Sequence, residues 1–217
     1  MSAKIKKIVL VGNSEKFNKI IHQLYRRAEI VVIPWRTLTK TLKKNDLSSF
    51  LDADLILVCG YDYSSSIYDY HTYIDANVTS PLEVIKVISN PDTLIIYIDT
   101  LPSAKSFTLS RYEYAKYLLG VGLREHFNHL AILNVPTIVN QNGKVDVQGG
   151  VFTKFFFNTL NQAGILKTIT TSVLSDSLIR TLKNLGTKKD DVLVLRSKFL
   201  KIRRTLFLDR LLRFVGG

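Results

Sequence analysis

The residues best suited to chemistry lie between positions 110 and 120, where the sequence reads SRYEYAKYLLG. Read as a helix, this stretch places Tyr112 and Lys116 one turn apart on the same face. An ammonium group beside a phenol favours the phenolate, and so lowers the pKa of about 10 toward the range useful for proton transfer. Because the chain has ten tyrosines, about one Tyr-x-x-x-Lys match is expected by chance. The motif therefore gains meaning only from the elements around it.

Short β-branched apolar runs alternate with helical patterns along the chain. The sequence predicts buried strands at residues 4–12, 29–33, 53–60, 93–98 and 129–135, and a last short strand at 192–195. It predicts helices at 14–27, 64–89, 112–127, 152–163 and 175–185, a weakly helical stretch at 37–51, a kink or break at Pro81 and a tight turn at Asn142-Gly143. The alternation indicates an α/β fold with a mostly parallel sheet and helices on both faces, in which ligands bind at the carboxyl ends of the strands.

Length and composition favour one folded domain. The chain has 217 residues, of which 46% are hydrophobic, and it has no internal repeat. Cys59 is its one cysteine, so an internal disulfide is excluded. No stretch approaches the ~20 apolar residues of a membrane-spanning helix. We expect a cytoplasmic protein with one domain at 1–195 and a basic segment at 196–217.

The segment 196–217 carries much of the formal net charge of +12, with seven basic residues and one acidic residue. From Leu206 onward, apolar and charged residues fall on opposite sides of a helix, which predicts a short basic amphipathic helix. It would dock on the domain or on a second subunit, or else bind anionic lipid peripherally through 198–217. A solvated basic tail is the plain alternative. A nucleic-acid partner rests on charge alone and ranks last.

Five segments follow one another in an order that resembles the short-chain dehydrogenase/reductase family, in particular its sugar-nucleotide epimerase and dehydratase branch. The segments are Asp54–Gly60, Asn77–Thr79, Tyr97–Thr100, the pair Tyr112 and Lys116, and Leu133–Thr137. In that family they correspond to a strand with a small-residue turn, an asparagine-containing helix, a strand ending in a catalytic Ser or Thr, the acid/base pair and a strand-to-proline turn. The resemblance implies a Rossmann-like, doubly wound fold.

The resemblance also implies catalytic roles. Tyr112 would be the general acid/base for hydride transfer at a carbinol or carbonyl carbon, and Lys116 would lower its pKa and bond the nicotinamide ribose. Thr100 would orient the substrate oxygen, with Ser103 as a weaker candidate. Asn77 would hold a water in the proton relay. A hydride acceptor needs a proton at its carbonyl oxygen, and a phenol with a neighbouring hydroxyl can supply one.

A dinucleotide site is implied as well. Its residues come from the turns after the first and third strands, together with one arginine and the lysine: Gly12, Asn13, Ser14, Arg36, Cys59, Gly60 and Lys116. Arg36 stands where an acidic residue would bond the ribose of NAD, so its guanidinium favours the 2′-phosphate of NADP over NAD. The neighbouring Trp35 would stack on adenine or cover the core.

The glycine-rich turn of the family is reduced in this chain. Of its three glycines only Gly12 is present, and Glu15 stands at the second position, where it brings negative charge toward a diphosphate. Two functions therefore stay open. The first is an atypical NAD(P)-dependent oxidoreductase or epimerase acting on a sugar nucleotide or a similar polar carbonyl compound. The alternative is a non-catalytic relative that has lost dinucleotide binding and acts as a binding or scaffold subunit.

Two further groups of residues bear on function. Tyrosines crowd the region after the third strand, where they would form an aromatic wall, a platform for a sugar or simply a half-buried helix face, which is the favoured interpretation. They are Tyr61, Tyr63, Tyr68, Tyr70 and Tyr73. The four histidines show no metal-ligand spacing, and no metal is expected.

Overall fold

The computed structural model describes residues 5–12, 14–38, 40, 47–100, 111–140, 142–145, 151–164 and 168–185. Several predicted features lie outside these residues: Asn13, Ser103, the strand at 192–195 and the amphipathic segment 196–217. The membrane or subunit contact expected of 198–217 stays a prediction for the same reason. No helix within the described part of the chain is both long and apolar enough to span a membrane.

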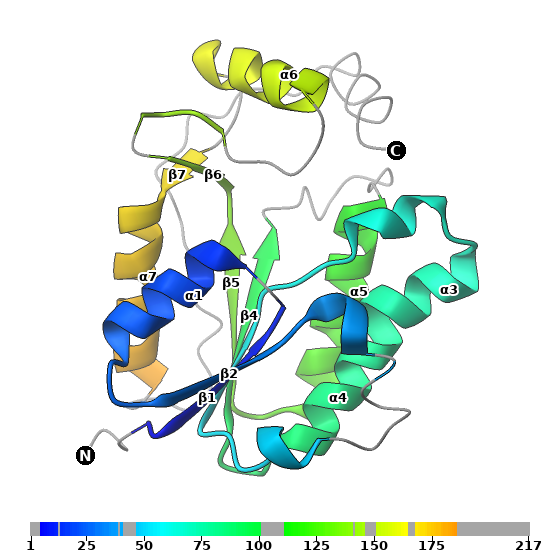
Figure 1. The fold of residues 1–217 in the computed structure, drawn as a ribbon, viewed down its shortest axis with the longest axis vertical. Coiled ribbons are helices and arrows are strands. Elements are labelled where there is room, and N and C mark those ends of the chain that lie inside the picture. The colour runs from blue at the N-terminus through cyan, green and yellow to red at the C-terminus, as the bar shows by residue number, and fades with distance from the viewer. Residues whose placement is uncertain are drawn as a thin grey trace.

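The central element is a five-stranded parallel sheet with the order β2-β1-β3-β4-β5 (Figure 1). Its strands are β1 (Lys7–Val11), β2 (Glu29–Ile33), β3 (Leu55–Val58), β4 (Leu94–Thr100) and β5 (Leu130–Val135). Each of the five strands predicted at 4–135 is confirmed, and β2 has the predicted bounds. Because β2 and β3 flank β1 on opposite sides, the strand order reverses between β1 and β3, and this is where such sheets bind ligands.

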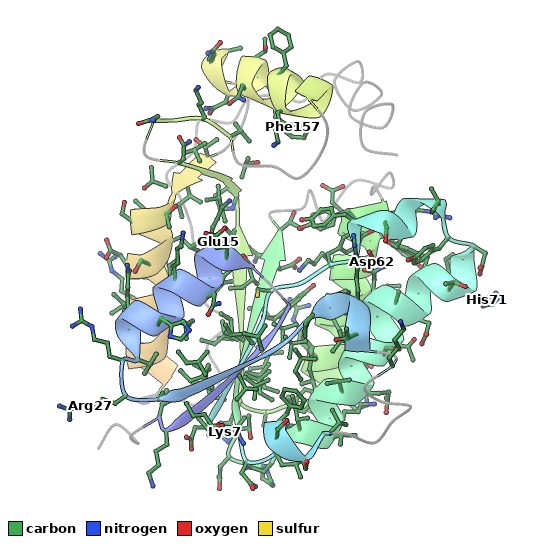
Figure 2. The ribbon with its side chains drawn as sticks, in the orientation of Figure 1. Lys7, Glu15, Arg27, Asp62, His71 and Phe157 are labelled. Carbon is green, nitrogen blue, oxygen red and sulfur yellow. The ribbon has the colours of Figure 1, made fainter. Side chains whose placement is uncertain are left out.

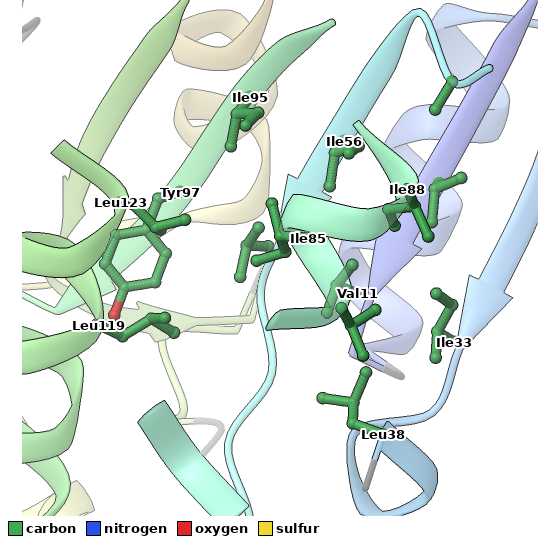
Figure 3. Close-up of a cluster of buried hydrophobic side chains, with 14 of the residues drawn as sticks. Val11, Ile33, Leu38, Ile56, Ile85, Ile88, Ile95, Tyr97, Leu119 and Leu123 are labelled. Carbon is green, nitrogen blue, oxygen red and sulfur yellow. The ribbon is translucent and has the colours of Figure 1, made fainter. Parts of the chain in front are cut away.

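Helices cover both faces of the sheet because the strands are apolar on both sides. On one face lie α1 (Glu15–Leu24) and α7 (Thr171–Leu185), and on the other lie α4 (Ser80–Ile88) and α5 (Arg111–His126). Side chains alternate accordingly along each strand. Ile56 and Tyr97 pack with Ile85 and Leu119 (Figure 3), while Leu57 and its neighbours pack against α1 and α7. The doubly wound fold predicted from the sequence is confirmed.

The helix predicted at 64–89 is interrupted. It consists of a 3-10 turn η3 (Tyr63–Ile67), α3 (Tyr70–Ile74), a π-helical turn η4 (Asp75–Thr79) and α4. Pro81 lies in the first turn of α4 and has no N–H, so the backbone one turn earlier cannot keep regular α-helical hydrogen bonds. The π turn supplies the break that Pro81 predicts. In the predicted helical stretch at 37–51, the described residues include α-helical Leu38 and Lys40 and the short turns η1 (Trp35–Thr37) and η2 (Ser48–Phe50).

A second, two-stranded parallel sheet follows β5 and was not predicted. It pairs β6 (Thr137–Val139) with β7 (Thr168–Thr170), and α6 (Val151–Gln162) lies between them in sequence. The predicted tight turn at Asn142-Gly143 is present, since the N–H of Gly143 donates to the carbonyl of Asn140 at 3.0 Å and Gly143 has a φ of 70°. In Figure 1, α6 lies above the carboxyl ends of the large sheet.

Candidate functional site

The carboxyl ends of β3 and β4 and the first turns of α5 meet on one side of the sheet. The helix predicted at 112–127 is α5, which spans Arg111–His126 and carries Tyr112 and Lys116 one turn apart as expected. Thr100 is the last residue of β4. The residues to which the sequence assigns chemistry therefore lie at the edge where α/β sheets bind ligands.

Lys116 is buried, with 4% of its surface exposed, and its ammonium faces the sheet. Its Nζ donates to the carbonyl of Ile98 at 3.1 Å and lies 5.0 Å from the ring centroid of Tyr97, a cation–π distance. Burial lowers the pKa of Lys116 to about 8, although the neighbouring Asp99 and Cys59 oppose the change. A lysine in this state loses its proton only slightly above neutral pH.

The carboxylate of Asp99 is the group that most strongly opposes the lowering of the Lys116 pKa. Sequence reasoning did not single out this residue. It is 9% exposed, and burial raises the pKa of its carboxyl group while Lys116 opposes that rise. Its Oδ1 accepts a hydrogen bond from the N–H of Thr100 at 2.8 Å. The signal was present, because a carboxylate inside an otherwise apolar buried strand is expensive and requires a partner.

Tyr112 packs among other tyrosines. Its ring centroid lies 4.7 Å from that of Tyr61, edge to face, and 5.8 Å from that of Tyr63, stacked at 20°. Burial raises the pKa of Tyr112 well above 10, and the neighbouring Tyr63 and Asp99 raise it further. This direction is opposite to the lowering expected from Lys116, whose ammonium donates to the carbonyl of Ile98 instead. One helical turn of separation did not make the two groups face each other.

Asn77 lies in the π turn and is 1% exposed. Its side-chain oxygen accepts from the N–H of Asp62 at 2.9 Å, and its side-chain nitrogen donates to the carbonyl of Tyr73 at 3.1 Å. The amide thus joins the segment after β3 to the end of α3. Its predicted role in a proton relay stays a prediction.

The turns expected to hold a dinucleotide are closely packed. Gly12 has a φ of 119°, and a Cβ there would lie 2.5 Å from the backbone of Gly60. A Cβ on Gly60 would lie 2.1 Å from Cε3 of Trp35. Trp35 itself is 6% exposed, and its indole N–H donates to the carbonyl of Ala76 at 3.0 Å. Of the two predicted roles for Trp35, the structure shows that it covers the core.

The start of α1 carries charge rather than glycine. Ser14 precedes the helix as its N-cap residue but makes no side-chain cap hydrogen bond. Glu15 follows in the first turn, and its carboxylate pairs with Lys19 one turn later at 2.6 Å, both side chains being exposed. Burial raises the pKa of the Cys59 thiol, which faces this turn, to about 12. Cys59 is therefore a protonated, packed thiol at neutral pH.

Arg36, predicted to meet a 2′-phosphate, is paired within the protein. Its Nε donates to Oδ1 of Asp62 at 3.2 Å, while 70% of the arginine side chain stays exposed. Asp62 is nearly buried; burial opposes its ionisation, but hydrogen bonds from Ser64 and Tyr68 hold the pKa of its carboxyl group below the usual value. Sequence reasoning did not identify Asp62. Glu15 and Asp62 lie at the same end of the sheet on opposite sides of it (Figure 2).

Comparison with known proteins identifies solved structures with a similar fold. No protein-family model and no curated protein sequence matches the chain. Among solved structures, ADP-L-glycero-D-manno-heptose-6-epimerase from Helicobacter pylori has a TM-score of 0.59 at 10% identity, over 89% of this chain and 77% of the epimerase. The dTDP-4-dehydrorhamnose reductase from Bacillus anthracis, in complex with NADP, has a TM-score of 0.55 at 12% identity, over 83% and 72%.

The chain has the fold of nucleotide-sugar epimerases and reductases. The enzyme WbmG of Bordetella bronchiseptica, in complex with NAD, is a further match, with a TM-score of 0.57 at 9% identity over 89% of this chain and 73% of that one. At such identities the likeness concerns the fold. The resemblance inferred from the order of motifs is thereby confirmed at the level of architecture, and the roles of individual residues stay predictions.

Within the described ranges, no group of three or more His, Cys, Asp or Glu side chains is arranged to hold a metal ion.

Proposed function

We propose that the protein is an NAD(P)-dependent oxidoreductase or epimerase that acts on a sugar nucleotide or a similar polar carbonyl compound. One observation carries the proposal: Thr100 ends β4, and Tyr112 and Lys116 lie in the first turns of α5, at the carboxyl edge of a sheet whose similar structures include complexes with NADP and with NAD. Similar folds also belong to enzymes named for nucleotide-sugar substrates. The chemistry of these side chains and their position in the fold both support the proposal.

A bound nicotinamide would accept or donate hydride, and the chain would handle the proton. Tyr112 is protonated at neutral pH and can donate to a carbonyl oxygen, although burial raises the pKa of its hydroxyl and so makes it a weaker acid than an exposed tyrosine. Thr100, the last residue of β4, would orient that oxygen. Lys116 supplies positive charge beneath this end of the sheet, balanced in part by Asp99.

The fit of the residues to a dinucleotide is partial. Gly12 and Gly60 supply the close backbone contact at the reversal of strand order, and Arg36 offers an exposed guanidinium. Glu15, in contrast, places a carboxylate at the N-terminus of α1, where a phosphate would otherwise gain from the helix dipole.

The packed contact of Gly12, Gly60 and Trp35 favours a second candidate. A non-catalytic relative that keeps the fold but not the dinucleotide site would serve as a binding or scaffold subunit. It would need no open turn after β1, and the indole would simply complete the core. The two candidates differ in one measurable property, which is affinity for NADPH and NADH.

The deciding experiment is a titration with NADPH and then with NADH. Trp35 is the chain's one tryptophan, and it contacts Gly60, so its emission reports on the turn directly. We expect micromolar binding in calorimetry, quenching of Trp35 and, for Arg36→Ala, a greater loss for NADPH than for NADH. No heat and no quenching at millimolar cofactor would overturn the enzymatic proposal and leave the scaffold function.

A further inference from the structure

Three tyrosine rings meet at the start of α5, and one of them belongs to the proposed acid/base residue, Tyr112. Tyr61 and Tyr63 come from the segment after β3, and Tyr112 from the first turn of α5. The rings of Tyr61 and Tyr63 lie 5.2 Å apart at 74°, and each also contacts Tyr112. Edge-to-face and stacked contacts of this kind hold aromatic rings in defined positions.

The backbone between the first two rings is fixed by Asp62. Its N–H donates to Asn77, and its carboxylate accepts from the N–H of Ser64 at 3.0 Å, from the Ser64 hydroxyl at 2.6 Å and from the Tyr68 hydroxyl at 3.1 Å. Arg36 adds a charged partner from the turn after β2. A nearly buried carboxylate with this many donors is costly to disturb, so the segment presents its rings in a set position.

Tyr63 nevertheless remains 49% exposed, although its backbone is fixed. One face of its ring lies against Tyr112, and its hydroxyl interacts with the Tyr112 hydroxyl. Under the proposed function, that hydroxyl is the group that must meet the reacting oxygen of the substrate. Tyr63 therefore occupies the partner position at the acid/base residue.

We infer that Tyr63 is a substrate-positioning residue, and that Tyr61 and Tyr63 form a stacking site for a hexopyranosyl ring whose reacting oxygen replaces the Tyr63 hydroxyl at Tyr112. The inference rests on the proposed function and deepens it, because it selects the cyclic sugar of a nucleotide sugar over an acyclic carbonyl compound. A pyranose offers apolar C–H faces with hydroxyl groups at the rim. A tyrosine offers the matching combination of an apolar face and a polar tip.

The experiment measures binding of UDP-, dTDP- and ADP-linked hexoses, and of the nucleoside diphosphates alone, to wild type and variants by calorimetry without cofactor. Tyr63→Ala removes the stacking face, and we expect about tenfold weaker binding of the sugar nucleotide that wild type prefers, with the diphosphate unchanged. Tyr63→Phe keeps the face and frees the Tyr112 hydroxyl, so affinity for the sugar nucleotide stays equal or improves.

Tyr70→Ala is the matched control. Tyr70 is a similarly exposed tyrosine, at 54%, but it lies on α3, and its hydroxyl is 3.5 Å from that of Tyr114 rather than near Tyr112. We expect sugar-nucleotide affinity within about twofold of wild type for this variant.

Equal losses in Tyr63→Ala and Tyr70→Ala, no loss in Tyr63→Ala, or no binding of any of the three sugar nucleotides by wild type would each overturn the inference. The NADPH titration is a separate measurement on the same variants. Failure of cofactor binding with a Tyr63-dependent sugar effect would sink the enzymatic proposal alone, whereas cofactor binding without that effect would sink the role of Tyr63 alone.

Discussion

The two halves of the carboxyl edge of the sheet contrast. Around β4 and α5, ionisable side chains approach one another in a buried setting, and the pKa values of Lys116, Asp99 and Tyr112 are all shifted by burial. Around β1 and β2, the backbone and one indole fill the space, and the charged groups Glu15 and Arg36 are paired at the surface. One half resembles a reaction site and the other a closed core.

The difference shows that a protein can retain the reactive side chains at one half of this edge while the phosphate-binding turn at the other half is altered. Perturbed pKa values at the end of a sheet indicate a functional site, although structural ion pairs also produce them. A dinucleotide needs both halves.

The largest expected effect is on catalysis. Tyr112→Phe removes the hydroxyl that would protonate the substrate oxygen, and we expect turnover to fall by about 100-fold or more. Steady-state kinetics with the sugar nucleotide and cofactor identified by binding would measure it. Tyr117→Phe, on the exposed side of the same helix, is the control and should retain wild-type turnover. Full activity in Tyr112→Phe would contradict the interpretation of the half around β4 and α5 as a reaction site.

The next effect is on stability in the closed half. Gly60→Ala forces a Cβ toward Trp35, and we expect the free energy of unfolding to fall by about 1 to 3 kcal/mol. Urea unfolding followed by far-UV circular dichroism measures it. In a Trp35→Leu background the cost should shrink, since the clash is with the indole.

Gly122→Ala on α5 is the control, because its added Cβ would meet only the end of the Leu82 side chain at 2.9 Å. Equal costs for the two alanine variants would show that the contact between Gly60 and Trp35 is not tight.

A smaller effect concerns pH. The pKa of Lys116 is about 8 when folded and about 10.4 in an unfolded chain, so between these values the unfolded state binds more protons. The free energy of unfolding contributed by this residue should therefore rise from pH 8 to pH 9.5, by on the order of 1 kcal/mol. Lys116→Met should lack that rise. Parallel pH curves for the two proteins would show that the lysine titrates normally.

The smallest effect tests the charge at the first helix. Glu15→Gln removes a carboxylate from the N-terminus of α1, and NADPH should bind about two- to fivefold more tightly at low salt. Glu83→Gln is the control, since Glu83 pairs with Lys86 on α4, away from the turn after β1. A weaker rather than tighter NADPH complex in Glu15→Gln would mean that the carboxylate helps to hold the cofactor.

The sheet was predictable from sequence because buried strands are continuous apolar runs, as in residues 55–58 and 94–98. The helix that carries Tyr112 and Lys116 followed from local periodicity. The separation of the Tyr112 hydroxyl from the Lys116 ammonium was not predictable. A helix fixes the positions of the two Cα atoms, but it does not fix the positions of the groups at the ends of the side chains. Lys116 reached the carbonyl of Ile98, and Tyr112 reached other aromatic rings.

Contacts between distant segments account for what was missed. Asp62 lies in the segment after β3 and forms hydrogen bonds with Arg36, after β2, and with Asn77, in the π turn. Trp35, after β2, packs against Gly60, after β3. The hydrophobic periodicity of a sequence does not predict such contacts between distant segments. The pairing of β6 with β7 was missed for a similar reason, since strands of three residues give almost no pattern.

That small sheet has a consequence for how the molecule can change over evolution. Thr137 pairs with Thr168, so the chain departs from and rejoins the main body at neighbouring points. The cost of closing a loop grows only slowly with its length. The intervening module could thus be shortened, lengthened or exchanged with little effect on the sheet, which makes it the natural place for a new specificity to be grafted.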